Sequence, residues 1–214
     1  MTLTTYKWDE LSTDEQDALL KRPAQDVDAS IRKRVTAILE QVRRVGDSAV
    51  AELTAKFDGV ELDDSRVSNE EIAAAATQLD AEAVAAIDLA IANVRRFHEA
   101  QLPQRLEIET MPGVLCERLS HPLDSVGLYV PAGTAPLPSA AIMLAVPAAL
   151  AGCPTRVLCT PPRPDGSADP AVLVAASRAG IADMFKIGGA QAVAAMAYGT
   201  ATVPRVRRFG RYGW

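Results

Sequence analysis

The sequence predicts an α/β protein in which a helical N-terminal arm and a β-hairpin precede an incomplete parallel sheet. Three short apolar runs, 126–130, 156–159 and 183–187, are each followed by a Gly/Pro-containing loop and an alanine-rich segment of helical length. Strands buried on both faces need such unbroken apolar runs, and the crossover helices cover them. Ligands of parallel sheets bind at the carboxyl ends of the strands. We therefore expect any ligand near the loops that begin at Pro131, Thr160 and Gly188.

Composition excludes several classes of protein. The 214 residues carry a formal net charge of −5, which argues against nucleic acid as the main partner. The longest apolar run, 140–151, is interrupted by Pro147 and is shorter than the roughly 20 residues of a membrane span. The first residues contain neither a basic nor an apolar signal region, so we expect no signal peptide and a cytoplasmic location.

Residues 1–104 are predicted to be helical, and two of their helices begin at capping boxes. Ser12 with Glu15, and Ser68 with Glu71, have the spacing of this motif. The first helix is expected to run to Leu20.

Between these two motifs, apolar residues recur at helical spacing from Ser30 to Phe57. Gly46 and Asp47 are expected to divide this segment, and the turn at 57–59 to end it. Asp80 marks another break before a helix over 81–101, which Pro103 stops.

Residues 105–125 are predicted to hold a β-hairpin and a connection. Apolar and polar residues alternate over 106–110 and 114–119, around Met111, Pro112 and Gly113. Period-two alternation indicates strands, here with one face exposed.

Two loops of the parallel sheet, which we assign to residues 126–204, are candidate ligand sites. In the loop 131–139, Ser139 is the expected helix N-cap, and the helix N-terminus offers amides to an anion; a rigid structural turn is the alternative. The loop 188–191 offers two glycines for close backbone approach and a donor and acceptor on Gln191. Tyr129, near the end of the first strand, is either a stacking platform for a planar ligand or an ordinary core tyrosine.

The sequence contains no spacing typical of a metal site or a catalytic triad. His98 and His121 have no histidine or cysteine at ligand spacing. Cys116, Cys153 and Cys159 form no CxxC pair, and we interpret them as reduced packing cysteines rather than as a nucleophile or a disulfide.

Several motifs resemble the histidinol dehydrogenase family in order and spacing. They are VGLYVPAGTAPLPS (126–139), AVPAALAGC (145–153), VLCTPP (157–162) and KIGGAQAVAAMAYGT (186–200), together with VRRVGDSAVAELTAKFDGV (42–60) upstream. Ala132 stands where the family usually has glycine. The resemblance extends from about residue 25 to Pro204.

The resemblance implies a Rossmann-like, aldehyde-dehydrogenase-like fold and a homodimer. It also implies NAD-dependent oxidation of L-histidinol to L-histidine in histidine biosynthesis. The family tyrosine and glutamine that contact NAD correspond to Tyr129 and Gln191. The family's Glu-His catalytic pair and its zinc ligands have no counterpart here, and neither His98 nor His121 matches one. The resemblance thus assigns no catalytic residue and no metal ligand to this chain.

Residues 205–214 depart from the family, which continues with a GPGN loop and about as many residues again. The Arg- and Gly-rich tail with a terminal tryptophan is typical of out-of-frame translation. We therefore expect a frameshift-truncated, inactive histidinol dehydrogenase. The nucleotide sequence beyond Val206 tests this expectation, because another reading frame should encode the GPGN loop. The competing account is an evolved short protein whose basic tail binds a partner, which predicts that the tail is ordered or needed for a measurable interaction. A free-standing, weak nucleotide-binding module and a subunit-interaction protein are the alternative functions.

Overall fold

The computed structural model describes residues 4–20, 29–132 and 135–211, and the chain divides into two compact units, Met1–Arg34 and Val35–Trp214. The first unit contains a short 3-10 helix, Trp8–Glu10, and helix α1, Thr13–Leu20. Glu15 accepts hydrogen bonds from the backbone N–H and the hydroxyl of Ser12, at 2.8 and 2.7 Å. The capping box predicted at Ser12 is therefore confirmed.

Helix α2, Ala29–Val45, crosses the boundary between the units, and α3, α4 and α5 follow it in the second unit. Gly46, with φ +69°, separates α2 from α3, and Gly59, with φ +71°, follows the last residue of α3. Both breaks lie where the sequence predicted them. The bounds of these three helices are Asp47–Asp58, Asn69–Thr77 and Ala81–Glu99.

The hairpin forms, but both of its faces are exposed. Strands β1, Leu106–Met111, and β2, Val114–Arg118, pair antiparallel around Gly113, whose φ of +80° suits the tight turn. Every residue of both strands is exposed in the described chain. The prediction of a single exposed face is thus wrong, because no described element covers the more apolar face.

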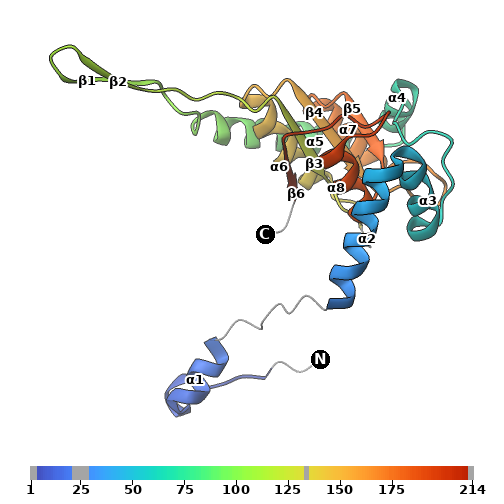
Figure 1. The fold of residues 1–214 in the computed structure, drawn as a ribbon, viewed down its shortest axis with the longest axis horizontal. Helices are drawn as coiled ribbons and strands as arrows, with labels where there is room; N and C mark the ends of the chain where they lie inside the picture. The colour runs from blue at the N-terminus through green and yellow to red at the C-terminus, as the bar shows by residue number, and fades with distance from the viewer. Residues whose placement is uncertain (1–3, 21–28, 133–134, 212–214) are drawn as a thin grey trace. The chain divides into compact units, whose positions relative to one another are not determined.

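Four parallel strands form the main sheet in the order β5-β4-β3-β6 (Figure 1). Strands β3, Ser125–Tyr129, β4, Thr155–Thr160, and β5, Asp183–Lys186, are those that the apolar runs predicted. Strand β6, Arg208–Arg211, lies in the tail, where the sequence predicted no element, and pairs with β3. The tail therefore extends the sheet beyond β3.

Apolar layers cover both faces of this sheet, which accounts for the unbroken apolar strands. On one face, α6, Pro138–Leu150, and α7, Pro170–Arg178, pack with α5 against Leu128, Leu158 and Met184. On the other face, α3 and α8, Gly189–Tyr198, pack against Val157 and Phe185. No helix of the described residues is both long and apolar enough to cross a bilayer.

Helix α8 packs closely against the middle of the sheet. A Cβ built on Gly127 of β3 would come within 2.6 Å of the Met196 sulfur and 3.1 Å of Val206. Real Cβ atoms do not approach other atoms so closely, so glycine at this position allows the contact. This contact packs the C-terminal half of α8 against the middle of β3.

The free edge of β5 is covered by the segment between α3 and α4. The Val67 N–H donates to the Met184 carbonyl at 2.9 Å, and the Lys186 N–H donates to the Ser65 carbonyl at 2.7 Å. Arg66 lies between these bonds, with its guanidinium 2.7 Å from Asp183. Such cover protects an edge strand from pairing with another chain.

Candidate functional site

Tyr129 and the N-terminus of α8 meet at the carboxyl end of the sheet. The Tyr129 hydroxyl accepts a hydrogen bond from the Gly189 N–H at 2.9 Å. This N–H belongs to the first turn of α8, where helix donors have no partner within the helix. Burial is the main cause that raises the pKa of Tyr129, so its hydroxyl stays protonated at neutral pH. The half-buried ring of Tyr129 thus reaches the glycine turn that the sequence singled out.

Gln191 lies in the first turn of α8 and is almost completely buried, with 1% of its surface exposed. Its Nε2 donates to Oδ2 of Asp58 at 3.5 Å, a long hydrogen bond. Among the described residues, no hydrogen bond reaches its carboxamide oxygen, Oε1. Oε1 is thus an acceptor that the described residues leave unused.

The two glycines leave little space for any other residue. A Cβ on Gly188 would lie 3.0 Å from both the Asp58 carboxylate and Pro161, and one on Gly189 would lie 2.7 Å from Gln191 Oε1. Gly189 also has a φ of +58°, a conformation that other residues rarely adopt. Glycine at these two positions therefore lets Asp58, Pro161 and Gln191 pack against the backbone of the turn, and its role in ligand binding stays a prediction.

The loop that follows β3 gives less evidence about the site than the glycine turn does. Residues 133 and 134 lie outside the described residues. The expected N-cap at Ser139 is wrong: α6 begins at Pro138 with Leu137 as its N-cap, because proline is favoured at the first helical position. No non-glycine residue in the described chain has a positive φ, so alanine suits position 132, where the family usually has glycine.

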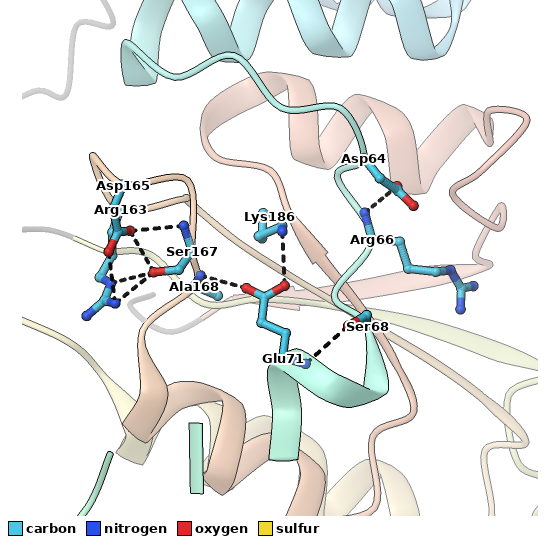
Figure 2. A network of polar contacts seen from close by, with 9 residues as sticks. All are labelled: Asp64, Arg66, Ser68, Glu71, Arg163, Asp165, Ser167, Ala168 and Lys186. Carbon is cyan, nitrogen blue, oxygen red and sulfur yellow. Dashed lines mark hydrogen bonds and ion pairs between the residues drawn. The ribbon is translucent and has the colours of Figure 1, made fainter. Parts of the chain in front are cut away.

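A second polar cluster lies at the end of β5, and sequence reasoning missed it. Figure 2 shows the Glu71 side chain pointing from the first turn of α4 toward Lys186 and Ala168. The Glu71 carboxylate accepts from the Lys186 ammonium at 3.0 Å and from the Ala168 N–H at 3.2 Å. Lys186 is the last residue of β5, and the glycine turn follows one residue later. The cluster therefore anchors the strand that leads into the site.

The remaining candidate residues do not join the site. Burial raises the pKa of the Cys159 thiol to about 12, so it is neutral and suited to packing; Cys153 is also buried and Cys116 is exposed. His98 contacts Gln101 at 3.1 Å. Within the described ranges, no three His, Cys, Asp or Glu side chains gather in a group that would hold a metal ion.

A small cavity of about 120 Å³ lies beside α3, away from these residues. Its lining includes Asp47, Thr54 and Thr202, but none of the residues of the glycine turn. Asp47 already accepts hydrogen bonds from the Thr202 N–H and hydroxyl at 3.1 and 2.9 Å. We interpret this contact as a tether between α3 and the turn after α8.

The chain resembles proteins of one family over nearly its whole length. The family model described as histidinol dehydrogenase matches residues 20–210. A histidinol dehydrogenase of Xylella fastidiosa (strain Temecula1) is 54% identical over 197 residues, which are 92% of this chain and 46% of that protein. A histidinol dehydrogenase of Xanthomonas campestris pv. campestris (strain 8004) is 51% identical over 202 residues, covering 94% of this chain and 47% of the relative.

A solved structure agrees with these sequences. The crystal structure of histidinol dehydrogenase from Elizabethkingia anophelis superimposes with a TM-score of 0.88 at 38% identity, covering 93% of this chain and 46% of that one. The chain thus spans about half the length of the relatives that it matches.

Proposed function

We propose that this chain, which belongs to the histidinol dehydrogenase family, forms the part of an NAD-dependent histidinol dehydrogenase that contacts the cofactor. In the family, the reaction oxidises L-histidinol to L-histidine in histidine biosynthesis. One observation carries the proposal: Tyr129 and Gln191, the residues that the resemblance assigns to NAD, meet at the Gly188–Gly189 turn through Gly189. Ligands of parallel sheets bind at this edge.

The residues at the turn are chemically suited to a dinucleotide. NAD, when bound, supplies the hydride acceptor of the reaction. The free Oε1 of Gln191 is an acceptor for a ligand N–H or O–H, and the Tyr129 ring offers a surface for a planar group. Glycine at positions 188 and 189 lets Asp58 and Gln191 pack against the backbone of the turn, beside Tyr129. Cofactor binding is therefore the function that these residues favour.

Zinc and proton transfer belong to the family reaction, but we assign them to no residue of this chain. The described residues bring no set of zinc ligands together. The Glu-His pair and the metal ligands of the family lie in sequence that these 214 residues do not match.

The chain alone is accordingly expected not to oxidise L-histidinol, because the groups that remove the proton and hold the zinc are not among those matched here. The measurement is NADH formation at 340 nm with L-histidinol, NAD and Zn²⁺. The full-length Xylella fastidiosa relative, assayed alongside, is the positive control. NADH formation that depends on both L-histidinol and this chain would contradict the expectation.

A further inference from the structure

Asp58 occupies a position that is unfavourable for a carboxylate. It is the last residue of α3, where the negative end of the helix dipole repels an anion. It is also half-buried, and this burial raises the pKa of its carboxyl group. No ion pair joins Asp58 to a cation of the described residues. Residues that break local rules in this way are expected at functional sites.

The surroundings of Asp58 are the residues of the cofactor site proposed above. One carboxylate oxygen accepts from Gln191 Nε2 at 3.5 Å, and the other lies 3.0 Å from the position that a Cβ on Gly188 would take. Tyr129 is close enough that the charge of Asp58 contributes to its raised pKa, after the larger effect of burial. A residue from the helical arm thus completes a cluster at the carboxyl end of the sheet.

The charge of Asp58 decides which way the Gln191 carboxamide points. An ionised carboxylate only accepts hydrogen bonds, so the NH₂ group of Gln191 must face it. The oxygen Oε1 then points away from Asp58, to the side of Gly189, where a Cβ would lie 2.7 Å from it. An acceptor, and not a donor, is left for a ligand.

We propose that Asp58 is a positioning residue that holds the Gln191 carboxamide with its oxygen free to accept from a bound dinucleotide. The donors that fit this oxygen are an amide N–H or a ribose O–H. The ligand part of the inference rests on the proposed function, whereas the orientation of Gln191 is a property of the chain itself and is tested separately.

A swap of the two functional groups tests the orientation without any ligand. Gln191→Glu places two carboxylates face to face and is expected to lower the melting temperature by several degrees. Adding Asp58→Asn restores an amide opposite a carboxylate, so the double variant should regain most of the loss. Asp63→Asn, which alters an exposed aspartate in the segment after α3, is the control and should restore nothing.

This comparison of the single and double variants tests the orientation even if one variant does not fold. If Gln191→Glu fails to unfold cooperatively, recovery of a cooperative transition in the double variant is the supporting result. An equal loss from Gln191→Glu in the wild-type and Asp58→Asn backgrounds, or a double variant that stays unfolded, would overturn the proposal, since interacting groups must show a coupling energy.

Titration with NAD then tests the consequence for the ligand. Asp58→Asn alone leaves the Gln191 amide free to turn, and we expect about a fivefold loss of affinity, the factor that one ordinary hydrogen bond supplies. Unchanged affinity in Asp58→Asn would overturn the ligand part. If the wild-type chain does not bind NAD, the proposed function fails, while the swap still decides the orientation of Gln191.

Discussion

Glu71 links three segments of the chain through one carboxylate. Its backbone N–H donates to the Ser68 hydroxyl at 3.1 Å, while its side chain accepts from Lys186 and from the Ala168 N–H (Figure 2). The ion pair is shielded: 12% of the Lys186 side chain and 23% of the Glu71 side chain are exposed. Water screens such a shielded pair only weakly. Removing one partner therefore leaves the other charge partly buried without a counter-charge.

Glu71→Gln is expected to lower the free energy of unfolding by about 2 kcal/mol, because the Lys186 ammonium loses its counter-charge. Urea denaturation followed by circular dichroism measures the change. Asp88→Asn is the matched control, since it breaks an ion pair with Arg178 whose side chains are 47% and 43% exposed. Exposed pairs contribute little, so the control should lose less than about 0.5 kcal/mol. Equal losses in both variants would refute the role of Glu71.

At the level of single residues, the sequence predicted only part of the candidate site. Tyr129 and Gln191 were predictable because a strand end and a Gly-Gly turn mark ligand positions, and the family resemblance assigned them a cofactor. Asp58 and Glu71 were not predictable as site residues, because their hydrogen-bond partners lie 133 and 115 residues away in the chain. The capping-box spacing even predicted a local partner for the Glu71 carboxylate, whereas the observed partners are distant. Their helix-end positions were the only sequence signal.

Among the elements, buried strands and capped helices were predictable from local patterns. The runs of β3, β4 and β5 and the breaks at Gly46, Gly59 and Asp80 follow from hydrophobic periodicity and capping. Strand β6 was missed because Arg208–Arg211 contains a single large apolar residue. It forms a strand by pairing with β3, and a pairing partner cannot be read from the strand's own sequence.

One exposed face of the hairpin β1–β2 is more apolar than the other, although it also carries Arg118, and the more acidic face also carries Leu115. The register places Ile108 opposite Cys116, with Leu106 on the same face, and Glu107 opposite Glu117 on the other. Exposed fractions of 43% and 50% for Leu106 and Ile108 are high for such side chains. We propose that this apolar face contributes to the homodimer that the family implies.

If the chain self-associates through this face, Ile108→Glu is expected to weaken that association in sedimentation velocity, because it places a charge on the face. Glu109→Gln alters the opposite face and should leave the distribution unchanged. A wild-type chain that sediments as a monomer at all concentrations, or equal behaviour of the two variants, would argue against this role of the hairpin.

For the molecule as a whole, the sheet and its two helical layers bring together the residues that we propose as cofactor contacts. Helix α3, from the N-terminal arm, and α8 pack on one face of the sheet. This packing brings Asp58 to Gln191, and the close contact at Gly127 holds α8 against β3. The family resemblance implies the cofactor, and the tertiary packing explains why Asp58 of α3 belongs to the same cluster as Gln191.

The most direct measurement is a calorimetric titration of NAD into the chain and into its Gln191→Leu variant, with thermal unfolding to verify that both are folded. Leucine has nearly the volume of glutamine but offers no acceptor, so the fold should persist while the ligand contact is lost. The proposed function predicts weak, saturable binding by the wild-type chain and none by Gln191→Leu at the same concentrations. No binding by the folded wild-type chain, or equal binding by both, would contradict it.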